Sequence, residues 1–141
     1  MSPVADSITA PAQGGEPVGQ RAQPRGEIRT QIADGLVALF KEYYGRGPDQ
    51  ARVYYVDDVV VVVLRGGFTR VEQTLLDGGH RDIVIEQRIM FQEVMADRFK
   101  ALVHEITGRH VVGFVSGNQP DPEMTCEVFV LAPQDGGNNA S

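Results

Sequence analysis

The sequence is poor in cysteine, tryptophan and basic residues. It has one cysteine, Cys126, and no tryptophan, and 13 lysine and arginine residues stand against 19 acidic ones, for a net charge of -6. A single cysteine excludes a disulfide within the chain and is typical of a reducing compartment. The acidic balance argues against a nucleic-acid partner, because affinity for phosphate backbones comes from clustered lysine and arginine.

Long hydrophobic runs are missing as well. The most apolar stretch, Val59–Leu64, is a short run of β-branched residues flanked by charge and glycine, whereas a membrane helix needs roughly 20 apolar residues. The N-terminus also lacks the basic start and apolar run of a secretory signal. We therefore expect a cytoplasmic protein that does not insert into a membrane.

The two ends of the chain differ in composition from its middle. Residues 1–25 are rich in Pro, Gly, Gln, Ala and Ser, and residues 133–141 read "PQDGGNNAS". Such segments hold too few apolar residues to offset the entropy lost on ordering. The sequence predicts a disordered leader over residues 1–25, one folded domain over residues 26–132 and a disordered tail over residues 133–141.

Apolar residues at three- and four-residue steps predict two long helices. The first stripe contains Ile28, Ile32, Leu36, Leu39, Phe40, Tyr43 and Tyr44, and the second contains Ile83, Met90, Phe91, Val94, Met95, Phe99, Leu102, Val103 and Ile106. Gly45 ends the first helix and Gly108 the second. Between them, "TRVE" at residues 69–72 matches a capping box, which predicts a further short helix.

Two hairpins complete the predicted fold. Arg52–Val56 and Val59–Leu64 flank Asp57-Asp58, a pair suited to a tight turn, and "HVVGFVS" and "MTCEVFVL" flank "GNQPDPE". The predicted order is α-ββ-α-α-ββ. We expect an α+β fold in which two helix-plus-hairpin units share one antiparallel four-stranded sheet covered by helices.

The residues offer little catalytic or metal-binding chemistry. Neither the three histidines nor Cys126 has the companions of common zinc patterns. Asp57-Asp58 could supply oxygen ligands to a hard cation, but a turn is the simpler interpretation. Cys126 in an apolar strand is interpreted as a core thiol, and His104 as a structural residue rather than a general base. We assign no catalytic residue, cofactor or metal, and a small enzyme using Cys126 or a histidine is the alternative.

One turn could bind a ligand. "RGGFT" joins a strand to a helix N-terminus, where backbone amides can hold an anion. It has neither the P-loop spacing nor the dinucleotide fingerprint, so glycine serving geometry alone is the competing interpretation. The ligand or interaction candidates are Arg65, Thr69, Glu72 and Arg88.

Taken in order, these motifs resemble a known family. "YYGRGPDQARVYYVDDVVVVVLRGGFTRVEQTLL", then Arg88, then "TGRHVVGFVSGNQPDPEMTCEVFVLA" is similar to the bacterial MpsC-like domain of a Na+-translocating membrane potential-generating system. The resemblance implies a soluble, non-catalytic accessory or regulatory domain linked to inorganic-carbon supply, with a membrane transport subunit as partner, and it transfers no catalytic residue. The alternative is a small-ligand or anion sensor using the Arg65–Glu72 turn.

The valine-rich strand also predicts self-association. Val59–Leu64 shows no polar alternation, so it presents apolar side chains to both faces of its sheet. If the helices form one layer, the other face carries alternate valines together with either the Tyr54/Val56 or the Val53/Tyr55 set. A patch of this kind is large for a monomer, and we expect a symmetric homodimer.

Overall fold

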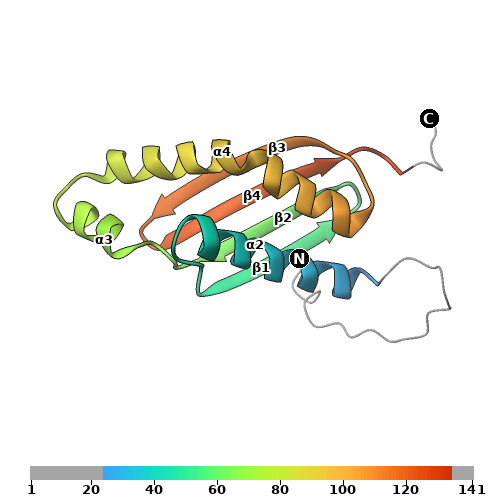
Figure 1. Ribbon diagram of the computed structural model, residues 1–141, viewed down its shortest axis with the longest axis horizontal. Coiled ribbons are helices and arrows are strands. Elements are labelled where there is room, and N and C mark those ends of the chain that lie inside the picture. The colour runs from blue at the N-terminus through green and yellow to red at the C-terminus, as the bar shows by residue number, and fades with distance from the viewer. Residues whose placement is uncertain (1–23, 135–141) are drawn as a thin grey trace.

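The computed structural model describes residues 24–134, and Figure 1 shows the chain as helices laid across a twisted antiparallel sheet. The helices are α2 (Arg25–Tyr43), α3 (Arg70–Asp77) and α4 (Arg81–Thr107), and the strands are β1 (Gln50–Val56), β2 (Val59–Arg65), β3 (Val111–Pro120) and β4 (Glu123–Leu131). The predicted α+β class and the order α-ββ-α-α-ββ are confirmed.

The predicted leader and tail fall mostly outside the described residues, which begin at Pro24 and end at Gln134. At the N-terminal boundary the prediction was slightly late. Helix α2 begins at Arg25, whose guanidinium donates a hydrogen bond to the backbone oxygen of Tyr55 at 3.0 Å and lies 3.7 Å from the centre of that ring. These contacts with β1 hold the first turn of α2 in place.

The two hairpins meet at the centre of the sheet, whose strand order is β1-β2-β4-β3 with every neighbouring pair antiparallel. The Asp57-Asp58 turn is confirmed, and Asp57 adopts a φ of 49°, a conformation that aspartate tolerates. The second hairpin is tighter than predicted. Residues 117–120 pair with β4 instead of forming the loop, and the turn contains only Asp121 and Pro122.

Helices α2 and α4 cross the same face of the sheet, α2 against β1 and α4 against β3 (Figure 1). The core lies between these layers. Its buried residues are Ile28, Ile32, Leu36, Phe40, Val53, Tyr55, Val60, Val62, Leu64, Met95, Phe99, Val103, Phe129 and Leu131. Val60, Val62 and Leu64 alternate along β2, so the intervening valines point to the other side of the sheet.

That other side, which we call the open face, carries a row of apolar residues directly opposite one another on the four strands: Tyr54, Val61, Val128 and Val115. Val115 is 64% exposed, and Val56, one row further along, is 57% exposed. Cys126 also lies on this face, beside Val63 in the register. The interpretation of Cys126 as a core thiol was wrong, because the cysteine is only partly buried and stands outside the core cluster.

The second apolar stripe was also partly wrong. Met95, Phe99 and Val103 face the core as predicted, but Met90 and Val94 are 55% and 73% exposed. In the first half of α4 the buried positions belong to Val84, Arg88 and Gln92. Polar side chains point inward there because they bond to polar residues of α3, β3 and β4.

Candidate functional site

The polar site begins at the N-terminus of α3, where the predicted capping box is confirmed. The amide of Glu72 donates to Thr69 Oγ1 at 3.1 Å, and the amide of Thr69 donates to Glu72 Oε1 at 2.9 Å. These bonds satisfy two backbone donors that the start of a helix leaves free. The cap also fixes the carboxylate of Glu72, which is fully buried.

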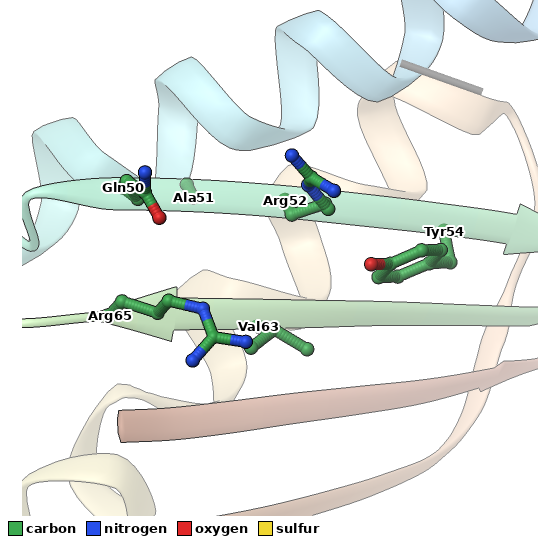
Figure 2. A pocket seen from close by; sticks show the side chains of 6 residues that line it. All are labelled: Gln50, Ala51, Arg52, Tyr54, Val63 and Arg65. Carbon is green, nitrogen blue, oxygen red and sulfur yellow. The ribbon is translucent and has the colours of Figure 1, made fainter. Parts of the chain in front are cut away.

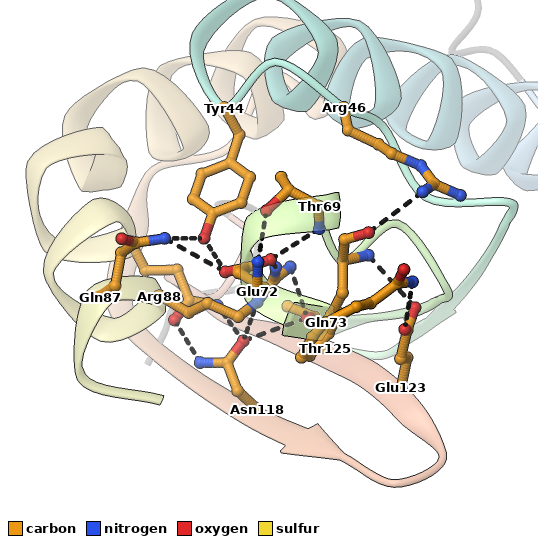
Figure 3. A network of polar contacts seen from close by, with 12 residues as sticks. Tyr44, Arg46, Thr69, Glu72, Gln73, Gln87, Arg88, Asn118, Glu123 and Thr125 are labelled. Carbon is orange, nitrogen blue, oxygen red and sulfur yellow. Dashed lines mark hydrogen bonds and ion pairs between the residues drawn. The ribbon is translucent and has the colours of Figure 1, made fainter. Parts of the chain in front are cut away.

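Arg88 on α4 supplies the positive charge that this buried carboxylate requires. Its Nη1 lies 2.8 Å from Glu72 Oε1 (Figure 3), and both side chains are almost fully buried. The guanidinium lies 3.9 Å from the centre of the Phe68 ring and 4.9 Å from that of Tyr44. An ion pair enclosed by aromatic rings is desolvated. Removing one partner therefore leaves the other charge buried in a low dielectric without a counter-ion.

Tyr44, at the end of α2, closes the same site from above. Its hydroxyl donates to Glu72 Oε2 and accepts from Gln87 Nε2 at 2.8 Å. Burial, followed by the hydrogen bond to Glu72, raises the pKa of the Tyr44 hydroxyl to about 12. The tyrosine therefore stays protonated at neutral pH and acts as a hydrogen-bond donor.

From Arg88 the polar contacts continue into the β3-β4 hairpin. Arg88 Nη2 donates to Thr125 Oγ1 and Nε donates to Asn118 Oδ1, both at 3.2 Å, and Asn118 Nδ2 donates to Gln92 Oε1 at 2.7 Å. Figure 3 shows Asn118 and Thr125 reaching toward Arg88 from the two strands. This network joins α3, α4 and the second hairpin through side chains alone.

Glu127 on β4 is the far end of the network. Gln92 Nε2 donates to its Oε2 at 2.8 Å and Ser116 Oγ to its Oε1 at 2.5 Å. Burial raises the pKa of the Glu127 carboxyl to about 7, although both hydrogen bonds and the charge of Arg88 act in the opposite direction. The Glu127 carboxyl therefore changes between its protonated and ionised forms near neutral pH.

A pocket of about 370 Å³ opens beside this end, between α4 and the edge strand β3. Gln92 and Ser116, the two partners of Glu127, line it together with Phe114, and Ile89, Glu93 and Ala96 complete its wall. The carboxyl itself is fully buried. Protons and small molecules would thus approach Glu127 past Gln92 and Ser116.

The structure brings three of the four candidate residues together. Thr69, Glu72 and Arg88 bond one another directly or through a shared partner, whereas Arg65 lies apart. Arg65 is exposed, and its Nη1 is 3.9 Å from the sulfur of Met124. The four do not form one ligand-binding group.

The glycine turn before α3 already has carboxylates of the protein beside its backbone. The amide of Phe68 donates to Glu123 Oε1 at 3.2 Å, and a Cβ placed on Gly66 would lie 2.1 Å from Asp49 Oδ2. Glu123 thus occupies the Phe68 amide, and Arg46, the cation at this turn, pairs with Asp49 at 3.4 Å, so the protein's own carboxylates take both donors. The anion sensor at residues 65–72 stays a prediction without a supporting contact.

Gln92, Asn118, Thr125 and Glu127 were not anticipated as members of the site. Two of them stand at core positions of the sequence pattern. Gln92 lies three residues before Met95 and seven before Phe99, on the same face of the helix. Glu127 lies on the same face of its strand as Phe129. Polar residues at core positions indicate buried networks. The partners of Gln92, however, lie 26 and 35 residues away in the sequence and could not be paired from spacing.

A second polar contact locks the other end of the sheet. Arg109, just after α4, pairs with Asp58 and donates to the backbone oxygens of Asp57 at 3.0 Å and Ala132 at 2.8 Å. Asp58 thus has an ionic partner besides its place in the turn.

Within residues 24–134, no three His, Cys, Asp or Glu side chains gather where a metal ion could be held.

The comparison with protein families identifies the chain. Residues 24–133 match the family described as Na+-translocating membrane potential-generating system (MpsC), so the chain belongs to the MpsC family. Searches of the curated proteins and of the solved structures gave no match. Among the helices of residues 24–134, none combines the length and apolar character needed to cross a membrane.

Proposed function

We propose that this MpsC-family chain is a non-catalytic accessory or regulatory subunit of a Na+-translocating membrane potential-generating system. It works in the cytoplasm and acts by docking onto a membrane transport subunit. Family membership supports the system. The exposed apolar row on α4 is the observation that carries the docking role.

That row consists of Ile83, Met90 and Val94, which we call the outer row. Steps of seven and four residues return to nearly the same helical direction, so the three side chains form one line along the helix. All three are exposed, Val94 most of all at 73%. Arg88 and Gln92 occupy the buried side of the same turns. Polar residues therefore face inward here and apolar residues face outward, the reverse of the usual arrangement.

The reversal explains why the outer row is available to a partner. Apolar side chains at helical spacing are the anchors by which one helix packs on another. Glu86, Glu93 and Asp97 lie along one flank of the row and are exposed. The surface therefore suits a helix that is apolar along its centre and basic along one side.

The buried network supports a binding role over a catalytic one. Glu72 accepts from Thr69, Tyr44 and Arg88, and Glu127 accepts from Gln92 and Ser116. Carboxylates that are saturated by protein donors are arranged to hold elements together. In this proposal the network fixes the orientation of α4, and α4 presents the outer row.

Site-specific photo-crosslinking in cells that carry the system tests the proposal. A photoreactive residue at Val94 should crosslink to the membrane subunit of the same system, whereas one at Thr30, exposed on α2 beside β1, should give at least about tenfold less product because crosslinking needs direct contact. Met90→Lys combined with Val94→Lys should abolish co-purification with that subunit while leaving the circular dichroism spectrum unchanged. Equal crosslinking at the two positions, or unaltered co-purification of the double variant, would refute docking through this row.

A further inference from the structure

The open face of the sheet pairs an apolar centre with charges at opposite ends. The valines that alternate with the core residues of β2 lie on it, next to Val128 and Val115 of the following strands. The sheet has four strands, and β1 and β2 have seven residues each. With strands about 4.8 Å apart and a rise of about 3.3 Å per residue, a face of four strands and seven residues covers about 440 Å². The largest apolar patch on a typical monomer covers about 300–600 Å², so a face of this size is within that range, and such patches are often functional.

Two arginines occupy one end of this face (Figure 2). Arg52 and Arg65, with Gln50, Ala51, Tyr54 and Val63, line a pocket of about 470 Å³ that has no carboxylate in its wall. Within residues 24–134, the side chain of Arg52 has no ion pair or hydrogen bond, and the only polar contact of the Arg65 side chain is the sulfur of Met124. Although the chain is acidic, these two cations have no anionic partner in the part of it that the structure describes.

The opposite end of the first hairpin carries the complementary charge. Asp57 is exposed in the β1-β2 turn, and its carboxylate has no ion pair in the described part of the chain. The backbone oxygen of Asp57 accepts a hydrogen bond from Arg109 Nη1. The hairpin is therefore positive at its open end and negative at its turn.

We propose that the open face is covered by a second copy of this chain in a two-fold symmetric dimer. A two-fold axis that lies between the sheets and runs across the strands reverses the direction of β1 in the second copy. The start of β1 in one copy then lies over its end in the other, and Arg52 and Arg65 face Asp57 of the second copy. Symmetry makes this contact twice.

The same arrangement covers the apolar centre. With the axis at the row of Tyr54, Val61 and Val128, that row in one copy lies over the same row in the other, as in two sheets packed about 10 Å apart. A small anion held by the two arginines would leave these valines exposed. The apolar centre therefore favours a second copy over a small anion.

The first test exchanges the charges in the full chain. Arg52→Glu/Arg65→Glu and, separately, Asp57→Lys should each raise the dissociation constant of the dimer at least about tenfold, because each creates like-charge contacts at both ends. An equimolar mixture of the two variants should recover a heterodimer, since both of its ends then carry opposite charges. Native mass spectrometry distinguishes the heterodimer from either homodimer by mass, and the wild-type chain is the reference.

A second variant probes the apolar centre independently of the charges. Val128→Asp should give a folded monomer with an unchanged circular dichroism spectrum. A wild-type chain that is monomeric in light scattering at tens of micromolar would overturn the proposal. So would a dimer that persists in all of these variants, or a monomer that phosphate stabilises only when Arg52 and Arg65 are present, which would make the pocket an anion site.

Discussion

Arg88 and Glu72 form an ion pair of 2.8 Å between α4 and α3, sixteen residues apart in the chain and both almost fully out of contact with water. Around this pair the protein assembles its polar interior. The short helix α3 packs mainly on α4, so the pair and the capping box together determine how α3 is attached.

Arg88→Met should therefore destabilise the fold by about 3 to 5 kcal/mol, because Glu72 would remain buried without its cation. Urea denaturation of the variant and the wild type measures the difference. Arg70→Met is the matched control. Arg70 is exposed in the first turn of α3, and its replacement should change the free energy of unfolding by less than about 0.5 kcal/mol.

The double variant Glu72→Gln/Arg88→Met distinguishes a lost charge pair from lost packing. Without either charge, the destabilisation should be smaller than that of Arg88→Met alone. If the double variant were the less stable of the two, the buried charge of Glu72 would not be the source of the effect.

Stability should also depend on pH through Glu127. Its pKa is raised from 4.5 to about 7 in the folded protein, so between these values the folded state holds a proton that the unfolded state releases. The free energy of unfolding should therefore fall as pH rises through this window, by up to about 3 kcal/mol. Glu127→Gln cannot ionise, and its stability should be flat over the same range once the other groups are accounted for.

Chemical denaturation at pH 5, 6, 7 and 8 provides the comparison. Subtracting the curve of Glu127→Gln from that of the wild type isolates the contribution of this carboxyl. A difference that does not change with pH would show that Glu127 titrates at an ordinary pKa or not at all in the folded state.

The sequence predicted the parts of the fold that depend on neighbours in the chain. The Thr69–Glu72 cap and the Asp57-Asp58 turn are local patterns, and each formed as predicted. The network of Glu127 was missed because its bonds join distant segments. The outer row was misjudged for the same reason, since periodicity counts Met90 and Val94 as core until the polar partners of Arg88 and Gln92 are known.

Alanine substitutions at two glycines distinguish the cost of backbone strain from the cost of steric contact. Gly45 and Gly67 both have positive φ angles, 90° and 87°, but a Cβ on Gly45 would meet nothing within 4 Å, whereas one on Gly67 would lie 2.7 Å from Pro48 Cα. Gly45→Ala should cost about 1 to 2 kcal/mol from the left-handed conformation alone. Gly67→Ala should cost roughly 1 to 3 kcal/mol more, because the backbone after α2 must move.

Thermal unfolding of the two alanine variants at equal concentration gives the comparison. Both substitutions add one methyl group to a turn, so propensity effects are matched. Equal losses would mean that the contact between Gly67 and Pro48 is relaxed at no cost, and that the turn before α3 is not held against the end of α2.

Val61 and Val62 are neighbours that point to opposite sides of one strand. Substitutions at the two positions should therefore affect assembly and folding separately. Val62 is fully buried under the helices, while Val61 lies on the open face. Val62→Asp should destabilise the chain by at least about 3 kcal/mol, because the carboxylate has no partner in the core. Val61→Asp should cost the monomer about 1 kcal/mol, the range of strand propensities.

The two substitutions should also differ in their effect on mass in solution. Val61→Asp places like charges within the proposed dimer interface, so light scattering should report a folded monomer, whereas any Val62→Asp protein that folds should still dimerise. Denaturation at submicromolar concentration measures monomer stability apart from assembly. Strong destabilisation by Val61→Asp under those dilute conditions would mean that its face is covered within the monomer itself, and the second copy would then have no surface to bind.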